Sequence, residues 1–465
     1  MPHGLYDPLL GPTDSKNTSP CPTCGNLYLN CPGHAGHVEL CAPVYQPLTF
    51  PKLLILLRIK CLACHRFRLD KIQSKIFAAK FHLIDCGRIQ EALELDDNLS
   101  SVVSNDANIG PDGKSIDTKV KKKDMLVNAG RSITLFLDKK LASTPMTMNN
   151  KPVTLTSHER SVRRQLVKDF LSACGACKKC NNCRAHSPRI RHDNYNKVFQ
   201  SPLSDKMHKL NTAENIKIIP ASAFSELGTY PSGSGWASDD SDMEDDEIEE
   251  DNEPAGTSTM SDNEDEYDES AMLGHKTRES TVLNSSGKLT AQQRTAEKAS
   301  KPDKFMHALE VEAQAQITWQ FESFLCTKVF GNAHAQRGVK DEKGYGIFFM
   351  RAIPVPPSRF RPPMVMGTMT VEHAQNHYLN KVLELNDRLR VNFATVQAID
   401  SEGADSGKTD DKDNIQARAI STWIDLQTTV NCYIDSSKDP SGGAAQNVPN
   451  GIRQLLEKKE GMFRK

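Results

Sequence analysis

Residues 21–34, CPTCGNLYLNCPGH, contain four side chains of the kinds that bind transition metals. In the spacing C-x2-C-x6-C-x2-H these are Cys21, Cys24, Cys31 and His34. Two intervening residues let both thiolates of a tight turn face one ion, and Gly25 and Gly33 permit the positive φ that such turns need. Three sulfurs and one imidazole complete a tetrahedral shell and leave no position for a reacting water. The stretch therefore predicts a structural zinc site.

A second group of cysteines is divided between two distant parts of the chain. CLACH at 61–65 supplies Cys61 and Cys64, which are half of a tetrahedral site. CGACKKCNNC at 174–183 supplies four more cysteines, each separated from the next by two residues: Cys174, Cys177, Cys180 and Cys183. Successive turns in this run would overlap, so its four cysteines cannot easily surround one ion. One pair is therefore expected to join Cys61 and Cys64 in a second zinc site, closed across more than 100 residues.

The 174–183 run leaves three alternatives open. It could bind a zinc ion of its own, hold an iron–sulfur cluster, or keep some of its thiols free. The bacterial iron–sulfur run C-x2-C-x2-C-x3-C-P has a last spacing and a proline that are missing here. The isolated cysteines are expected to be ordinary buried thiols: Cys41, Cys86, Cys326 and Cys432.

Charge is distributed unevenly along the chain. Its 465 residues carry a net charge of −1, but residues 239–269 hold 17 of the 59 acidic side chains and no Lys or Arg. The remainder has 58 basic and 42 acidic side chains, a net charge of +16, which is typical of a protein that lies against nucleic acid. High charge with few aliphatic residues predicts that residues 230–303 are a disordered acidic linker.

The cysteine usage also bears on the cellular compartment. Knuckle-spaced cysteines without a secretory signal indicate metal ligands in a reducing environment rather than disulfides. The longest apolar stretch, LLILL at 53–57, is too short to cross a membrane, so no membrane partner is expected.

The pattern of apolar residues predicts an α+β fold that is mainly helical. Apolar spacing of three and four predicts helices at 51–60 and 71–95. A further helix is expected to begin with Ser157 as its N-cap, and a long helix is expected over 302–330 with Pro302 at its first position. An apolar strand at 346–363 ends in prolines. Later helices are expected at 370–398, 414–434 and 451–465.

Four stretches resemble the N-terminal part of the largest subunit of multisubunit DNA-directed RNA polymerases. They are GLYDPLLGP at 4–12, CPTCGNLYLNCPGHAGH at 21–37, FFMRAIPVPPSRFRPP at 348–363 and GIRQLLEKKEGMFRK at 451–465. Within that family the sequence is most similar to the RNA polymerase I subunit. The last cysteine pair runs into SPRIR, the chain has a long acidic insertion, and its final helix reads LLEKKEG shortly before FRK.

The resemblance implies a zinc-stabilised clamp, which is a mobile arm that closes over DNA, with a helical head and a long disordered acidic insertion. In chain order the expected parts are a zinc-knuckle clamp core (1–70), a helical clamp head (71–173), the second zinc half-site with the return to the core (174–229), the linker (230–303) and a helical clamp base (304–465). Within the base, residues 361–370 would form a lid-like loop and 435–450 a rudder-like loop. The basic end would begin a switch that meets template DNA.

The resemblance also implies roles for particular residues. Because Cys180 and Cys183 precede RAHSPRIR, they match the family's last ligands of the second site, whereas Cys174 and Cys177 are the alternative pair. Two Zn²⁺ ions are therefore expected. Nucleic-acid contacts are expected from Arg361, Lys458, Lys459, Arg464 and Lys465.

The family's catalytic Mg²⁺ is held by an Asn-Ala-Asp-Phe-Asp-Gly-Asp run, and that run does not occur in these 465 residues. The sequence is therefore expected to be a piece of a polymerase subunit that carries no catalytic residue, with the Mg²⁺ bound elsewhere in the enzyme. The implied partners are template DNA, the DNA–RNA hybrid, the second-largest subunit and other RNA polymerase I subunits, in the nucleus and nucleolus. The alternative is a stand-alone zinc module that binds nucleic acid or protein without polymerase activity.

Overall fold

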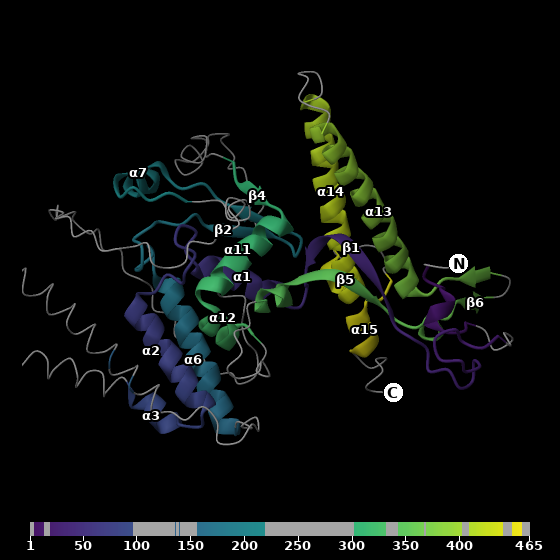
Figure 1. The fold of residues 1–465 in the computed structure, drawn as a ribbon, viewed down its shortest axis with the longest axis horizontal. Helices are drawn as coiled ribbons and strands as arrows, with labels where there is room; N and C mark the ends of the chain where they lie inside the picture. Colours follow the sequence, from purple (N-terminus) through teal and green to yellow (C-terminus); the bar gives the residue numbers. More distant parts are fainter. Residues whose placement is uncertain are drawn as a thin grey trace, which may run out of the picture.

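The computed structural model describes residues 4–13, 19–95, 135, 139, 156–218, 302–331, 343–366, 369–401, 409–439 and 449–457. Helices and strands are mixed, as the sequence predicts, and Figure 1 shows an elongated arrangement from which two long helices project. The helices are α1 (Phe50–Ile59), α2 (Lys71–Asp85), α3 (Ile89–Leu93), α6 (Ser157–Ala176), α7 (Asp205–Ala213), α11 (Ala308–Phe321), α12 (Ser323–Val329), α13 (Ala374–Ser401), α14 (Thr409–Ile434) and α15 (Ile452–Leu456). The strands are β1 (Gly36–Tyr45), β2 (Ile190–Asp193), β3 (Lys197–Gln200), β4 (Lys304–Met306), β5 (Phe349–Val355), β6 (Met364–Met366) and β7 (Met369–Val371). The acidic linker expected at 230–303 lies almost entirely outside the described residues.

The pairing of β1 with β5 joins parts of the chain that are about 300 residues apart in sequence. The two strands are antiparallel, with Gly36 opposite Val355 and Tyr45 opposite Phe349. In an antiparallel pair the start of one strand faces the end of the other. The cysteine–histidine stretch just before β1 is therefore brought next to the proline-rich segment 356–363 just after β5 (Figure 1).

Helix α1 lies at the centre of the hydrophobic core. Phe50, Leu53, Leu54 and Leu56 are each no more than 1% exposed, because seven of the ten residues of the helix are apolar and buried, and so apolar a helix is stable in water only if it is enclosed. It contacts α6, α11 and β2. The core continues through Trp319 of α11, which is fully buried.

The helical pair α13 and α14 is attached to β1 by side-chain amides. The β1–β5 register shifts between Glu39 and Val44, which leaves backbone groups of β1 without a partner on β5. Asn386 of α13 accepts from the Cys41 N–H at 2.9 Å and donates to the Glu39 carbonyl at 3.0 Å. Gln427 of α14 makes the same two bonds with the Tyr45 backbone, at 2.6 and 3.0 Å. Side chains of the helices that lie on β1 thus supply hydrogen-bond partners for its backbone N–H and C=O groups.

The prediction of one long helix over 302–330 is wrong, because the helix begins later and is interrupted. Pro302 precedes β4, and α11 begins only at Ala308, where the His307 imidazole accepts from the Glu310 N–H at 3.2 Å and caps the helix. The helix then breaks at Glu322, where φ is −128° and ψ is 35°. Glu322 lies 3.4 Å from Arg66 near the second cysteine group, so a tertiary ion pair accompanies the break.

Other helix boundaries also differ from the predictions: α13 begins at Ala374, α14 begins at Thr409, and α15 ends at Leu456. Two further differences have a clear local cause. The N-cap of α6 is Thr156 rather than Ser157: Thr156 and Glu159 form a reciprocal capping box, which uses the residue exactly three positions before the glutamate. The single helix expected over 71–95 is divided into α2 and α3, because Gly87 takes a φ of 77° that an α-helix cannot contain.

The loop expected at 435–450 begins with an anchored residue. Asp435 is only 1% exposed. It accepts hydrogen bonds from the Ser437 N–H at 3.1 Å and the Gln454 amide at 2.7 Å, and it forms an ion pair with Arg453 at 3.0 Å. Burial raises the pKa of Asp435, but these hydrogen bonds outweigh it and leave the pKa well below its usual value. Asp435 therefore fixes α15 to the end of α14, whereas most of the remaining loop lies outside the described residues.

Asp435→Asn should lower the free energy of unfolding by about 1–3 kcal/mol at pH 7, because it removes the charge that Arg453 and Gln454 bind. Since the folded-state pKa is below the unfolded value of about 3.9, the contribution is present above that pH and is lost only as the pH falls towards the folded-state pKa. The difference should thus be equal at pH 8 and pH 6 in urea denaturation. Asp387→Asn, which disrupts an exposed ion pair with Arg390, is the matched control and should cost less than about 0.5 kcal/mol.

Candidate metal centres

The first cluster brings together the four residues that the sequence singles out: Cys21, Cys24, Cys31 and His34. Their ligand atoms all lie within 4.8 Å of one another. The Cys31 Sγ is 3.6 Å from the Cys24 Sγ and 3.6 Å from His34 Nε2. Two sulfurs bound to one tetrahedral zinc at about 2.3 Å lie about 3.8 Å apart, so the donor set fits such an ion in both type and spacing.

The loop that carries this cluster has almost no hydrophobic core of its own. Between residues 21 and 34 the only buried side chains are Cys21 and Cys31, while Leu27 and Leu29 are 53% and 84% exposed. Gly25 and Gly33 have φ values of 72° and 82°, which confirms the sequence-based reason for placing glycine there. Because so little apolar surface is buried, the conformation of this loop depends on what its four ligands bind.

The second cluster joins Cys61 and Cys64 to Cys180 and Cys183, and its four sulfurs also lie within 4.8 Å of one another. Cys61 is 3.6 Å from Cys183, and Cys64 is 3.8 Å from Cys180. The sulfurs accept further hydrogen bonds: Ser187 Oγ donates to Cys61 at 3.6 Å, and the Asn182 amide donates to Cys64 at 3.5 Å. Outer hydrogen bonds of this kind orient metal ligands, and the sequence offered no spacing rule from which Ser187 or Asn182 could be recognised.

Three C-x2-C turns in the two clusters share one backbone conformation. In each, the N–H of the first cysteine donates to the carbonyl five residues later, namely that of Asn26, Arg66 or Ala185, at 2.9, 2.8 and 3.0 Å. The residue before that carbonyl has a positive φ in all three, namely Gly25 at 72°, His65 at 56° and Arg184 at 59°. This turn points both sulfurs to the same side, which is why a two-residue gap suits a metal.

The first half of the 174–183 run cannot form this turn. Cys174 lies within α6, is fully buried and belongs to the hydrophobic core, and Cys177 caps the end of the same helix. The Cys177 thiol donates to the Ala173 carbonyl at 3.4 Å. Among the described residues only the two clusters above gather three or more metal-binding side chains, so the alternatives of a separate centre within 174–183 find no support. Of the isolated cysteines, Cys326 and Cys432 are buried as expected, but Cys41 is exposed and Cys86 is half-buried.

The four cysteines of the second cluster cannot all be ionised at once in the absence of a cation. Hydrogen bonds from the neighbouring thiols, first Cys180 and then Cys183, hold the pKa of Cys61 well below its usual range. A hydrogen bond with Cys180, followed by those with Cys61 and Cys64, raises the pKa of Cys183 far above its usual range. One thiolate thus suppresses ionisation of its neighbours, and a divalent cation at the centre would remove this repulsion because a coordinating thiol is deprotonated outright.

Arg184→Gly should stabilise the chain by about 1 kcal/mol. The left-handed backbone conformation is sterically unfavourable by about that amount for a residue with a Cβ atom, whereas glycine adopts it freely. Arg184 is exposed, so the change removes little packing. Arg184→Val, which adds a β-branched side chain at the same φ, should destabilise it. Chemical denaturation of the metal-loaded chain measures both, and an unchanged midpoint for the glycine variant would show that Arg184 is not strained.

Arg361 is not placed to contact nucleic acid, and that expectation is corrected. Its side chain is 0% exposed and donates to the carbonyls of Pro356 and Leu5, at 3.0 and 2.8 Å, and to the side-chain carbonyl of Asn376. Asn376 in turn donates to the Tyr6 hydroxyl at 2.6 Å. Burial lowers the pKa of the Arg361 guanidinium. Arg361 therefore ties the N-terminal segment to the start of α13.

The remaining expected contacts are not tested by the structure. Lys458, Lys459, Arg464 and Lys465 lie outside the described residues. The lid-like segment 361–370 contains β6 and most of β7, which pair as a short antiparallel hairpin with Met364 opposite Val371.

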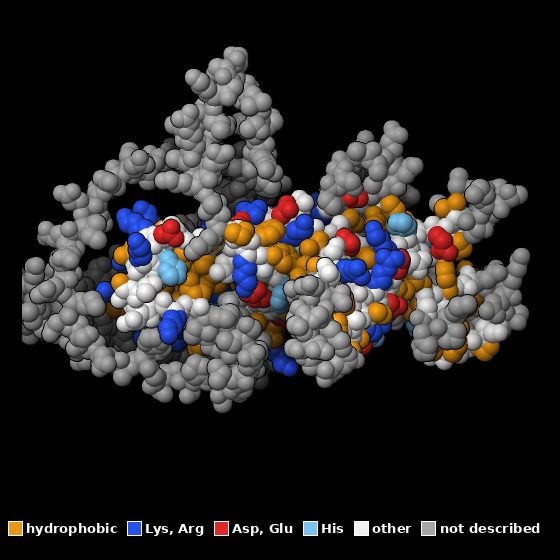
Figure 2. All heavy atoms as spheres, turned by 90° about the horizontal axis from the view of Figure 1, so that it is seen from above, with side chains coloured by type: hydrophobic (Ala, Val, Ile, Leu, Met, Phe, Trp, Pro, Cys, Tyr) orange, Lys and Arg blue, Asp and Glu red, His pale blue; other side chains and the backbone are white. Residues whose placement is uncertain are grey.

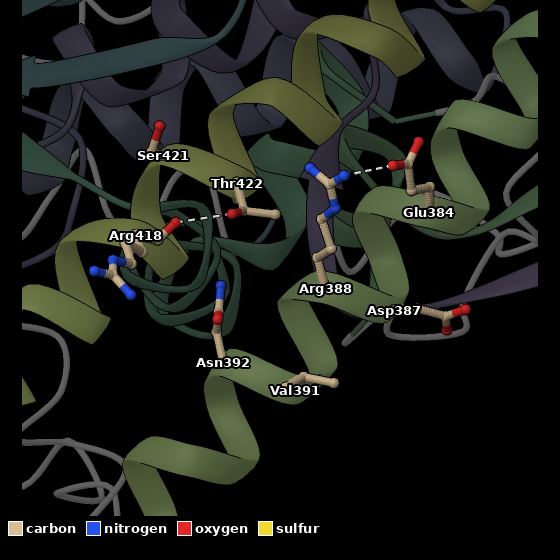
Figure 3. A pocket seen from close by; sticks show the side chains of 8 residues that line it. All are labelled: Glu384, Asp387, Arg388, Val391, Asn392, Arg418, Ser421 and Thr422. Atoms are coloured by element: carbon tan, nitrogen blue, oxygen red, sulfur yellow. Dashed lines mark hydrogen bonds and ion pairs between the residues drawn. The ribbon is translucent and has the colours of Figure 1, made fainter.

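A groove of about 640 Å³ lies between α13 and α14 (Figure 3). Two of its polar side chains are bonded within their own helices: Arg388 donates to Glu384 at 2.5 Å, and Thr422 donates to the Arg418 carbonyl at 2.8 Å. The groove is therefore the solvent-facing furrow of a helix pair, and its lining does not resemble a set of converging reactive groups. Among the described helices none combines the length and apolar character needed to cross a bilayer.

Comparison with known proteins agrees with the sequence motifs. The family model described as RNA polymerase Rpb1, domain 1, matches residues 1–227. DNA-directed RNA polymerase I subunit rpa1 of Schizosaccharomyces pombe is 29% identical over 479 residues, covering 99% of this chain and 26% of the relative. Subunit RPA190 of Saccharomyces cerevisiae is also 29% identical over 479 residues, covering 99% of this chain and 25% of the relative. Subunit RPA1 of Euplotoides octocarinatus is 26% identical over 506 residues, covering 99% of this chain and 68% of the relative.

The chain thus spans about a quarter of the length of the two fungal relatives. Its similarity to them extends beyond the region matched by Rpb1 domain 1 and takes in nearly every residue. The family resemblance noted in the sequence is confirmed: the chain is similar to RNA polymerase I largest subunits over nearly its whole length, and its first 227 residues match Rpb1 domain 1.

Proposed function

We propose that this chain is the clamp region of RNA polymerase I, which closes over template DNA and the DNA–RNA hybrid while rRNA genes are transcribed. The observation that carries the proposal is that the metal-binding clusters lie in the part of the chain that matches the family model. All eight clustered ligands fall within residues 1–227, the part that matches Rpb1 domain 1. The relatives named as polymerase I subunits align with the chain over nearly its whole length.

Both clusters are proposed to hold structural Zn²⁺. Cys21, Cys24, Cys31 and His34 would bind the first ion, and Cys61, Cys64, Cys180 and Cys183 the second. Four protein ligands leave no open coordination position, so the ions would fix backbone rather than activate water. The second ion would join two segments that are more than 100 residues apart, between the end of α1 and the start of β2.

Contact with DNA is proposed to be independent of base sequence. Figure 2 shows Lys and Arg side chains spread along one face of the molecule, interspersed with acidic ones, rather than gathered in a single patch. A diffuse basic charge suits phosphate contacts, which supply affinity without reading bases. The basic residues at 458–465 are proposed to extend this contact.

Nucleotidyl transfer is proposed to belong to the whole polymerase, with its Mg²⁺ bound outside these 465 residues. The partners would be the second-largest subunit and other polymerase I subunits. The site of action would be the nucleus, and within it the nucleolus. The proposed domain division, with a clamp core, a helical head and a helical base, rests on the same similarity.

Immunoprecipitation with an antibody raised against residues 239–269 tests the proposal. The expected result is recovery of a second large polymerase subunit in stoichiometric amount, together with DNA-dependent RNA synthesis in the precipitate. Recovery of a zinc protein without any polymerase subunit would contradict the proposal and favour a stand-alone zinc module.

A further inference from the structure

The first metal centre is held against the rest of the molecule by a few polar contacts, because its loop buries so few apolar side chains. The His34 N–H donates to the Leu10 carbonyl at 3.1 Å, and the Thr23 hydroxyl donates to the Leu9 carbonyl at 2.7 Å. These two contacts reach one side of the loop. The other side meets the proline-rich segment that follows β5.

One side chain of that segment touches the ligand loop twice. Arg359 donates from its guanidinium to the backbone carbonyl of Cys31, and the same guanidinium lies 5.0 Å from the centroid of the Tyr28 ring. Tyr28 belongs to the six residues between Cys24 and Cys31. Arg359 therefore links the middle of the loop to the turn that carries the last two ligands, through a charged hydrogen bond and a cation–π contact.

The segment that presents Arg359 is itself held firmly. The Ser358 hydroxyl, in a residue only 2% exposed, donates to the Gly11 carbonyl at 2.9 Å. A Cβ on Gly33 would lie 2.6 Å from the Pro357 Cβ, so the ligand turn and the segment approach as closely as glycine allows. Two consecutive prolines stiffen the backbone immediately before it. Arg359 thus projects from a segment that is held by Gly11 and by the ligand turn itself.

Charge favours the same arrangement. Three thiolates and one neutral imidazole around a divalent ion carry a net charge of −1, and a guanidinium bonded to the carbonyl of one ligand residue lies on the outside of that centre. A cation there stabilises the net negative charge of the ligated centre, and loss of its hydrogen bond would free the turn from Cys31 to His34.

We infer that Arg359 is a positioning residue of the first metal centre. It holds the turn from Cys31 to His34 in ligand geometry and slows loss of the ion, and the bound ion in return holds the segment from Pro356 to Arg361 in place. This inference rests on the proposed zinc site. The coupling joins the first centre to the start of the β6–β7 hairpin, since residues 361–363 lead directly into β6.

The forward test measures zinc release from the purified 465-residue chain with an excess of chromophoric chelator. Cys31→Ser and Cys180→Ser identify which kinetic phase belongs to which centre. Arg359→Gln should speed release of the first ion by about 10-fold or more, the usual scale for removing an outer partner of a metal site. It should leave the second ion unaffected, and Arg359→Lys, which keeps a cation above Tyr28, should release the first ion more slowly than Arg359→Gln does.

The matched control is Arg351→Gln. Arg351 lies on β5 and pairs with Glu312 at 2.7 Å, away from the ligand loop, so both release rates should be unchanged. Equal release of the first ion by Arg359→Gln and the wild type would overturn the inference. Faster release of both ions together would also overturn it, because that pattern reports general destabilisation. A wild-type chain that holds no zinc would instead refute the proposed function.

The reciprocal test uses the native arginine as a protease site and does not depend on an Arg359 variant being stable. Trypsin can cleave between Arg359 and Phe360, whereas Pro362 protects the bond after Arg361. Cys31→Ser, which lacks the first ion but keeps the carbonyl that Arg359 binds, should yield the fragment beginning at Phe360 at least 10-fold faster than the wild type, because cleavage follows the population of the opened segment. Cys180→Ser should match the wild type at this bond. Equal cleavage in all three proteins would overturn the inference.

Discussion

Replacing Cys180 by serine should remove one of two zinc ions and destabilise the two segments that the second centre joins, at the end of α1 and before β2. Structural zinc binds zinc-finger peptides with an apparent free energy of about 10–16 kcal/mol, and that energy is part of folding when no preformed site exists in the unfolded chain. A domain is stable by only about 5–15 kcal/mol, so the loss is large on this scale. Elemental analysis should find one zinc per chain instead of two, and the melting transition should broaden.

Cys177→Ser provides the matched control within the same cysteine run. Its sulfur donates to the Ala173 carbonyl rather than joining the cluster, so the zinc content should stay at two ions. A variant set in which Cys177→Ser loses an ion while Cys180→Ser keeps both would reverse the assignment of the second centre.

Lowering the pH offers a second measurement of zinc binding. Bound cysteines must be deprotonated, so protons compete with the metal and zinc content should fall as the pH is lowered from 7 towards 5.

Replacing Arg361 by methionine should lower the free energy of unfolding by about 3–5 kcal/mol. The substitution keeps an unbranched side chain of similar length but leaves the carbonyls of Leu5, Pro356 and Asn376 buried without their donor. Urea denaturation should show a lower midpoint with an unchanged slope, because the surface exposed on unfolding is the same.

Arg390→Met is the control for Arg361. Arg390 forms an exposed ion pair with Asp387 at 2.6 Å, and such pairs contribute little, so its loss should cost less than about 0.5 kcal/mol. The two possible roles of Arg361 also predict different behaviour for Arg361→Lys. If Arg361 were a surface phosphate contact, lysine would leave the stability unchanged. The buried guanidinium should not be replaceable in this way, because an ammonium cannot reproduce its three directed hydrogen bonds to fixed acceptors.

Several features of this protein follow from local sequence alone. The ligand spacing around Cys21 and Cys31, the glycines at 25 and 33, and the apolar helix at 50–59 are all properties of short stretches, and the structure places them as those stretches predict. A C-x2-C turn is set by hydrogen bonds within six residues, which is why its identity can be read from spacing. The family motifs are likewise local, and the comparisons confirm them.

Other features were decided only by tertiary structure. The 174–183 run offers overlapping pairs with equal spacing, and α6 settles the matter by extending to Ala176 and enclosing Cys174 in the core. The resemblance predicted a nucleic-acid contact for Arg361, but β1–β5 pairing carries it into contact with residue 5, more than 350 positions away in sequence. Helix α11 breaks at Glu322, where the side chain pairs with the distant Arg66. In each case the deciding partner comes from a distant segment, and no local pattern of spacing or hydrophobicity carries information about which segment will return to meet it.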